Sequence, residues 1–223
     1  MKEQSEKKPG VRQASMEQKR KTILKSACCL FTQNSIDATS MEDISTHAGI
    51  GSATLYRYYP TKQLLACACA LSYWQELQEQ YLPLFETSAY QQSSGLCQLA
   101  RILDLFPVLY EQHRGFLSFR MDFDCFLKSS APPAALLADY ESLIFSLKDV
   151  AVSAILHGIE DGTIRSGASA EELYFTIFHC MLSTTQKLAL QGNLLPMDGL
   201  VDGKRQLTLL ITTLINGLKN GKE

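Results

Sequence analysis

Two short helical patterns joined by a tight turn constrain the fold of this chain more than any other feature. Apolar residues recur at helical spacing over residues 41–48 and again over residues 52–58. Gly49, between them, is typical of the residue that ends a helix. Pro60 ends the second pattern, because it disfavours helical geometry in the residue before it. The segment therefore predicts a helix-turn-helix.

The same segment supplies what a helix-turn-helix needs to hold its shape and to approach DNA. Ser40 and Asp43 match a capping box, which predicts that the first helix begins at Met41. Four apolar residues are expected to pack the two helices together: Ile44, Ala48, Ile50 and Leu55. Small residues at the start of the second helix, where the helix dipole favours phosphate, allow close contact with DNA: Gly51, Ser52 and Ala53.

Every other periodic segment of the chain also indicates a helix, and no stretch alternates with a period of two. Thr61 is expected to cap a long helix. The remaining expected helices cover residues 16–33, 61–85, 96–113 with an interruption near Pro107, 115–127, 134–160, 170–190 and a last stretch after the glycine-rich loop 192–203, with a break at 129–133. The chain is therefore predicted to be all-α, with about nine helices in total.

Charge is distributed unevenly along the chain. Residues 1–63 carry ten Lys and Arg against six Asp and Glu, a formal charge of +4, and the remainder carries eleven against seventeen, a charge of −6. This asymmetry favours an N-terminal part that faces a polyanion. Residues 1–14 lack periodicity and contain Pro9 and Gly10, so we expect a flexible basic arm there.

The bulk sequence favours a globular protein of the cytoplasm. Residues 1–12 do not resemble a secretory signal, and the longest weakly polar stretch noted, residues 64–74, is shorter than the roughly 18 residues of a membrane span. The seven cysteines form neither a CxxC motif nor a disulfide framework, so we expect reduced thiols. No membrane partner and no cofactor are predicted.

At this point the sequence resembles a known family. The run SMEDISTHAGIGSATLYRYYPTKQLL, residues 40–65, is similar to the DNA-binding domain of TetR/AcrR transcriptional regulators, and the resemblance covers about residues 17–65. It departs from the family pattern at Ser45, Gly51 and Ala53, and Gly51 leaves the start of the second helix to be settled, with Ser52 as an alternative cap. The resemblance implies a DNA-binding domain over residues 15–63 and a ligand-binding and dimerisation domain over residues 64–223.

The resemblance also assigns roles to individual residues. Carried over by position, contacts with operator DNA fall on Thr39, Ser40, Ser52, Ala53, Thr54, Tyr56, Arg57, Tyr58 and Lys62. Lys62 stands in the first turn of a helix, where the dipole disfavours a cation, which favours a phosphate opposite it. Tyr59 is expected in the core.

In the C-terminal part, the resemblance implies a homodimer built from the last two helices of each subunit and a ligand pocket between the middle helices. The candidate dimer residues are Leu173, Ile177, Met181, Leu207, Leu210, Ile211 and Leu214. The candidate ligand residues are Trp74, Phe106, Tyr110, His113, Phe119, Arg120, Phe123 and His179. Aromatic residues with a few polar ones favour a small apolar or aromatic effector, but Asp122 or Asp124 is an alternative partner for Arg120.

The leading interpretation is a homodimeric repressor that leaves a palindromic operator when an effector binds, with residues 61–85 coupling the two sites. Two alternatives stay open: a metal- or thiol-sensing regulator of the same fold, with His113, Asp122, Asp124 and Cys125 as conceivable metal ligands, and an effector-independent DNA-binding protein. Catalysis is not expected, because GxGxxG, GxSxG, HExxH and paired CxxC motifs are missing from the sequence.

Overall fold

The computed structural model describes residues 11–130, 134–165, 167–191 and 196–221. Within these ranges the chain is helical throughout, with no β-strand and one isolated bridge between Ile164 and Lys219. The elements are α1 Val11–Asn34, α2 Met41–His47, α3 Ser52–Tyr58, α4 Lys62–Tyr81, η1 Leu82–Phe85, α5 Ser88–Gln91, α6 Gly95–Leu103, α7 Leu105–Gln112, α8 Arg114–Ser130, α9 Ala134–Glu160, α10 Ala170–Gln191, η2 Pro196–Gly199 and α11 Gly203–Leu218. The all-α prediction is confirmed.

The described helices number eleven where nine were predicted, because one short helix was missed and one was divided. The missed helix is α5, a single turn. The division between α6 and α7 falls at Asp104, three residues before Pro107, where the interruption was expected. Proline lacks an N–H and its ring collides with the carbonyl four residues earlier, here that of Leu103. The helix therefore breaks one turn upstream of the proline.

Two predicted boundaries need correction. Helix α1 begins at Val11, so residues 11–14 of the expected arm are helical, and residues 1–10 lie outside the described residues. Helix α8 continues through Ser129 and Ser130, which were expected to lie in a break. Both hydroxyls donate to the carbonyl of Phe126, and these bonds satisfy a backbone acceptor of the last turn.

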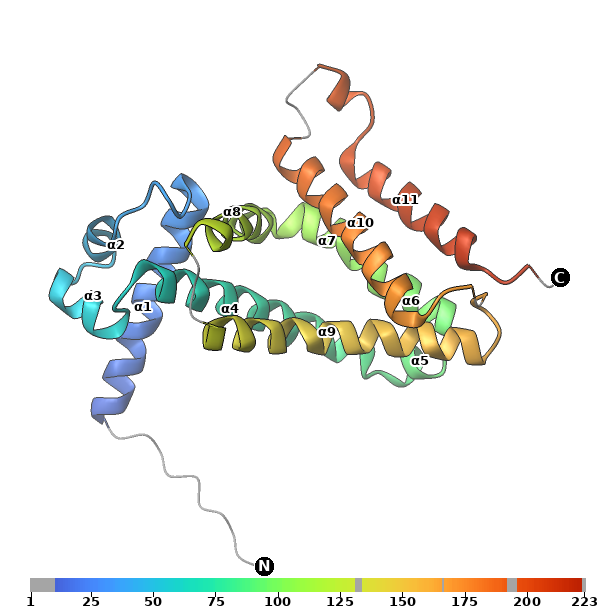
Figure 1. The fold of residues 1–223 in the computed structure, drawn as a ribbon, viewed down its shortest axis with the longest axis horizontal. Helices are drawn as coiled ribbons and strands as arrows, with labels where there is room; N and C mark the ends of the chain where they lie inside the picture. The colour runs from blue at the N-terminus through green and yellow to red at the C-terminus, as the bar shows by residue number, and fades with distance from the viewer. Residues whose placement is uncertain (1–10, 131–133, 166, 192–195, 222–223) are drawn as a thin grey trace, which may run out of the picture.

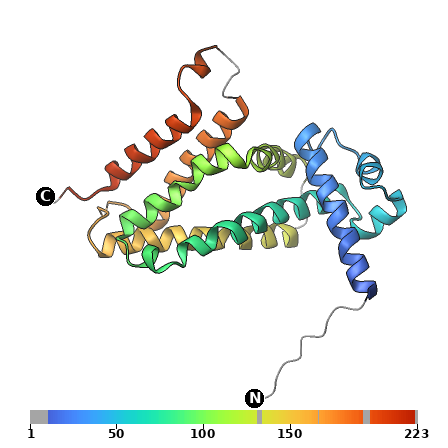
Figure 2. The ribbon, with the colours of Figure 1, turned by 180° about the vertical axis from the view of Figure 1, so that it is seen from behind.

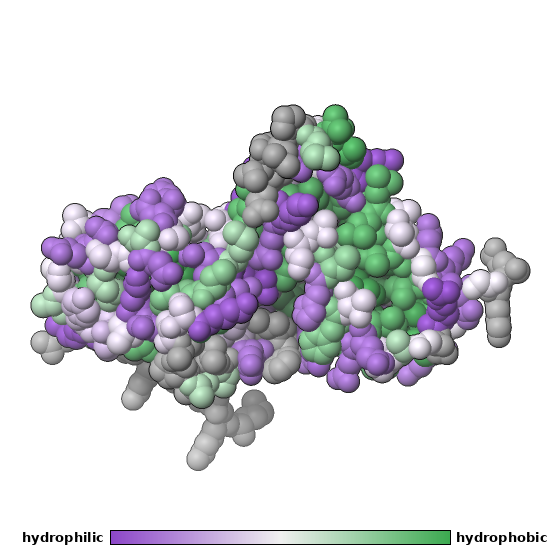
Figure 3. Space-filling view, turned by 45° about the horizontal axis from the view of Figure 1, so that its top comes forward, coloured by the Kyte–Doolittle hydropathy of each residue, from purple (hydrophilic) through white to green (hydrophobic). Residues whose placement is uncertain are grey.

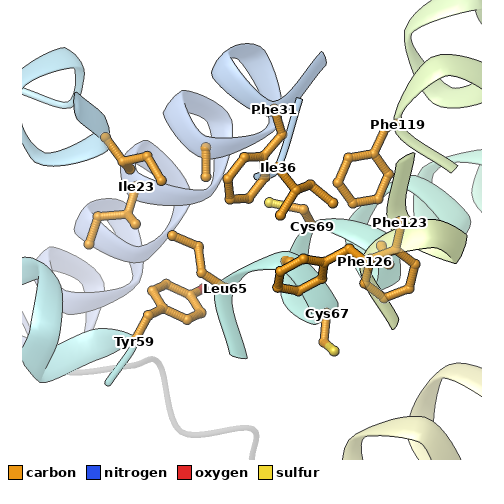
Figure 4. Close-up of a cluster of buried hydrophobic side chains, with 14 of the residues drawn as sticks. Ile23, Phe31, Ile36, Tyr59, Leu65, Cys67, Cys69, Phe119, Phe123 and Phe126 are labelled. Carbon is orange, nitrogen blue, oxygen red and sulfur yellow. The ribbon is translucent and has the colours of Figure 1, made fainter. Parts of the chain in front are cut away.

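Helices α1 to α3 form one end of the molecule, and helices α4 to α11 form the larger part that extends from it (Figure 1). The core at this junction joins α1 and α4 to α8 (Figure 4). Phe31 of α1 stacks on Phe119 of α8 with ring centroids 6.4 Å apart, and Phe119 stacks on Phe123 at 5.5 Å. All three rings are at most 1% exposed. Helices α1 to α3 therefore share one core with α4 and α8.

A second core fills the larger domain, where α6 and α7 pack on the inner side of α10 and α11 (Figure 2). At Gly95 and Gly158, the backbones of helices α6 and α9 approach each other directly. A Cβ on Gly95 would lie 1.9 Å from the backbone nitrogen of Gly158, so only glycine fits at this crossing. The close approach fixes α9 against the first turn of α6.

Helix α9 contains a longer apolar stretch than the one noted from the sequence. Its segment Tyr140–Glu160 is longer than residues 64–74 and, by length and composition alone, is apolar enough to cross a membrane. In the fold, Ala151, Ala154 and Ile155 of this segment are buried in the second core. The apolar composition of α9 is accounted for in part by these core contacts.

Candidate DNA-binding interface and ligand cavity

The helix-turn-helix forms as its sequence predicts. The hydroxyl of Ser40 accepts from the backbone N–H of Asp43 at 3.0 Å, and the carboxylate of Asp43 accepts from the N–H of Ser40 at 2.8 Å. A cap of this kind stabilises a helix by about 1 kcal/mol. The hydroxyl of Ser40 also donates to this carboxylate, and that bond, followed by the one from the N–H of Ser40, lowers the pKa of Asp43. Gly49 turns the chain at φ +65°, a conformation that other residues rarely adopt.

Two of the three departures from the family pattern, at Ser45 and Gly51, can be followed in the structure. Gly51 is the N-cap of α3 and supplies no side-chain bond, so α3 begins at Ser52, and Ser52 is not the cap. The hydroxyl of Ser52 lies 3.2 Å from that of Ser45, which is buried and also donates to the carbonyl of Glu42. A pair of serines therefore ties α2 to the first turn of α3.

The surface of α3 carries most of the predicted DNA contacts. Ser52, Ala53, Tyr56 and Arg57 are exposed, whereas Thr54 and Tyr58 are half-buried. Leu55, on the opposite side of the helix, is fully buried in the shared core. The helix thus presents hydroxyls, a guanidinium and an N-terminus without a side-chain cap away from the protein. This combination is suited to phosphates and base edges.

Three other predicted contacts have partners within the protein. Lys62 donates to the carbonyl oxygens of Ile36, Asp37 and Thr39 at 2.8, 3.2 and 3.2 Å. Thr39 is 2% exposed, and its hydroxyl donates to the carbonyl of Ser35 at 2.7 Å. The exposed Ser40 uses its hydroxyl in the capping box. In this arrangement Lys62 and Thr39 position the loop before α2.

Tyr59 lies in the core, 3% exposed, as expected from the sequence. Nε of Arg20 donates to its hydroxyl at 3.3 Å, and the guanidinium carbon lies 5.6 Å from the ring centroid. Burial raises the pKa of Tyr59, so the hydroxyl stays neutral at ordinary pH. This contact fixes α1 against the C-terminal end of α3.

Helix α8 reaches the DNA-binding end directly. A carboxylate oxygen of Asp122 accepts from the backbone N–H of Ile36, in the loop between α1 and α2. Lys62 donates to the carbonyl of the same residue. One residue of the loop, Ile36, is therefore held through its N–H from α8 and through its carbonyl from α4.

A cavity of about 210 Å³ lies between the middle helices. Four predicted ligand residues line it, namely Trp74, Phe106, Arg120 and His179. Phe116 of α8, another aromatic residue considered as a candidate, also lines it. Further lining residues from η1, α6, α7, α9 and α10 were not predicted: Phe85, Ile102, Leu105, Leu109, Leu147, Val150, Tyr174, Phe175, Phe178 and Leu182. The aliphatic ones among them resemble any core residue.

The other four predicted ligand residues do not line this cavity. Phe119 and Phe123 belong to the shared core. Nε2 of His113 lies 2.8 Å from the hydroxyl of Tyr81, and burial lowers the pKa of this histidine. Tyr110 faces the start of α11, where its hydroxyl would lie 2.6 Å from a Cβ on Gly203.

Most predicted dimer residues are buried inside the protomer. Ile177, Met181, Leu207 and Ile211 are at most 6% exposed and pack α10 and α11 on the second core. They are therefore core residues of the protomer, as expected where the most apolar stripe of an amphipathic helix faces its own core. Leu210 is half-buried against the same core. Leu173 and Leu214 border a shallow groove between α10 and α11.

The outward side of α10, η2 and α11 nevertheless carries exposed apolar residues, and Figure 3 shows apolar side chains gathered over this part of the molecule. We call this surface the outer face; its most exposed apolar residues are Met197, Leu200, Val201 and Leu209.

The conceivable metal ligands do not come together. His113 pairs with Tyr81, Asp122 with Ile36 and Asp124 with Arg120, and Cys125 is exposed. Among the described residues, no three His, Cys, Asp or Glu side chains form a group able to hold a metal ion.

All seven cysteines are free thiols. Burial raises the pKa of Cys69, and Cys28 beside it raises it further. The neutral thiol is the poorer nucleophile, so the environment of Cys69 does not favour thiol sensing there.

These elements define a class: a helix-turn-helix DNA-binding domain fused to a helical domain with an internal cavity. Residues 23–69 match the model of the bacterial regulatory proteins of the tetR family. The resemblance predicted from the sequence is confirmed, and the N-terminal domain is a tetR-family helix-turn-helix domain. No curated protein sequence matches the chain.

Solved structures share the whole fold. The transcriptional regulator FadR from Bacillus subtilis, in complex with stearoyl-CoA, is 16% identical with a TM-score of 0.67, and the match covers 89% of this chain and 99% of that one. A regulator from Saccharomonospora viridis in complex with choline is 14% identical with a TM-score of 0.71, covering 90% and 96%. A TetR-family regulator from Agrobacterium tumefaciens is 16% identical with a TM-score of 0.69, covering 91% and 98%. The chain therefore has the fold of TetR-type transcriptional regulators.

Proposed function

We propose that the chain is a homodimeric repressor that binds a palindromic operator and leaves it when a small molecule occupies the cavity. The observation that carries this proposal is the connection between the two sites. Helix α8 lines the cavity with Phe116 and Arg120, and its Asp122 bonds to the loop that precedes the helix-turn-helix. A change in the position of α8 on ligand binding would therefore reach α2 and α3.

Operator binding requires two copies of the chain. One α3 helix reads only a few base pairs, and dimeric helix-turn-helix proteins place two such helices about 34–36 Å apart in successive major grooves. The outer face of α10 and α11 is available for a second copy. It lies away from α3, so a dimer formed there leaves both recognition helices free (Figure 1).

The test is an anisotropy titration of purified protein against labelled DNA from upstream of its own gene, with a scrambled duplex as control and a salt series for each. A sequence-specific regulator binds the first duplex at two subunits or more per site and about 1,000-fold more tightly than the second. Equal binding to the two duplexes, or no binding to either at low salt, would contradict the proposal for this DNA.

A further inference from the structure

The cavity is apolar, but its wall includes one guanidinium, that of Arg120. Thirteen of the fifteen lining residues are aliphatic or aromatic, seven of them Phe, Tyr or Trp. The remaining two are Arg120 and His179, and the described residues that line the cavity include no aspartate or glutamate. A wall of this composition leaves the guanidinium as the principal polar anchor.

Arg120 has only part of its hydrogen-bonding capacity satisfied by the protein. Its Nη1 lies 3.2 Å from Oδ2 of Asp124, one helical turn away. Its Nε is buried, and none of the described residues accepts a hydrogen bond from it. Asp124, one of the internal partners considered from the sequence, is therefore present, but it leaves Nε of the guanidinium without an acceptor. Nε itself has no surface open to the cavity, so a ligand would meet the rest of the guanidinium, which lines the cavity wall.

We propose that the cavity binds a small apolar carboxylic acid, an arylalkanoate or a medium-chain fatty acid, whose carboxylate pairs with the guanidinium of Arg120. The planar guanidinium presents its N–H groups as a fork that matches a carboxylate. The aromatic wall holds the apolar body of the ligand. This assignment rests on the proposed function, because it names the class of effector for the same site.

The size of the cavity limits the ligand further. Ligand pockets usually enclose about 300–1,000 Å³, and this one encloses about 210 Å³. A free acid with one ring or a chain of moderate length suits this volume. A whole coenzyme A thioester, such as the ligand of the Bacillus subtilis protein, does not. A quaternary ammonium, such as choline, has no carboxylate to pair with the guanidinium of Arg120.

Trp74 provides a direct readout, because it is the single tryptophan of the chain and lines the cavity. Its ring lies 5.0 Å from that of Phe116, another lining residue. We would titrate 4-phenylbutyrate and octanoate into the full-length protein while recording tryptophan fluorescence, with calorimetry as a second measurement. The matched controls are the amide and the alcohol of each acid, which keep the apolar body and remove the charge.

The acids are expected to bind at least about tenfold more tightly than their amides and alcohols, because a hydrogen bond to a charged group outweighs one to a neutral group. This comparison uses the natural chain and so does not depend on the folding of a variant. Equal or tighter binding of the amides would overturn the proposal. So would the absence of any signal from both acids at concentrations up to about 1 mM, the weak end of specific affinity.

Variants test the residue itself. Arg120→Met should bind acid and amide with equal affinity, whereas Lys128→Met, an exposed site on the same helix, removes the same charge and should keep the preference for the acid. If Arg120→Met does not fold, Arg120→Lys retains the charge without the fork and should bind the acids more weakly than the natural chain. A full preference for the acid in either Arg120 variant would overturn the assignment.

DNA binding separates this inference from the function on which it rests. A chain that binds its operator specifically but shows no preference for acids refutes the ligand class alone. A chain that prefers acids yet binds no DNA refutes the proposed function and leaves the ligand class standing.

Discussion

Lys62 shows at the scale of one residue how a sequence-based assignment and a structure can differ. A cation in the first turn of a helix favoured a phosphate partner, since the helix dipole repels it. In the structure the partners are three backbone carbonyls of the loop before α2. These acceptors come from residues 36–39, more than twenty positions earlier in the chain. No local pattern around Lys62 could have identified them.

Substitutions of Lys62 and Arg57 are therefore expected to have opposite effects on stability and on DNA binding. Lys62→Met should lower the free energy of unfolding by about 1–2 kcal/mol without DNA, because charged hydrogen bonds to the loop are lost at a half-buried site. Arg57→Met, on the exposed surface of α3, should leave stability nearly unchanged and reduce the salt dependence of DNA binding by about one phosphate contact. Urea denaturation and anisotropy over a salt series measure the two effects. A stable Lys62→Met protein with a reduced salt slope would instead make Lys62 a phosphate contact.

At the scale of elements, the helices whose signals are local were predicted well. Ser40 with Asp43, Gly49, Pro60 and Thr61 lie at or next to the ends that they were expected to define, because caps and turns depend on residues only a few positions apart.

Helix faces were harder to predict from the same sequence. The stripe that contains Leu207 and Ile211 is apolar whether it meets its own core or another subunit, so periodicity could not distinguish the two. Phe119 and Arg120 are adjacent on α8, yet one is in the shared core and the other lines the cavity. Which side of α8 faces which core depends on its packing against α1, far away in the sequence.

Helix α8 also gives the larger domain a second route to the DNA-binding end, besides the expected one through α4. Asp122→Ala removes the acceptor for the N–H of Ile36 and should destabilise the protein by about 1–3 kcal/mol, because that backbone group loses its partner. Asp122→Asn keeps a neutral acceptor and should cost less. Hydrogen exchange of peptides that cover residues 31–41 should accelerate in the alanine variant. Unchanged exchange there would show that the bond does not hold the loop.

At the scale of the whole molecule, the arrangement of the two ends sets a requirement on assembly. Helix α3 lies at one end, and the outer face lies on the other side of the larger domain (Figure 1). Leu209, Leu200 and Met197 on this face are 46%, 80% and 68% exposed. Apolar residues gathered on one surface indicate an interaction site more than scattered ones do. A second copy of the chain is the partner that the proposed function requires.

Leu209→Glu tests this arrangement. Two added carboxylates at a two-fold interface repel each other and are costly to bury, so the dimer should dissociate while each protomer stays folded. Leu156→Glu is the matched control, since Leu156 is 48% exposed on α9 and lies outside the outer face. Sedimentation velocity should show monomers for the first variant and dimers for the second. Operator affinity should fall about 100-fold or more only in the first, because a monomer loses the second half-site contact. A dimeric Leu209→Glu protein with normal operator affinity would place the interface elsewhere on the surface.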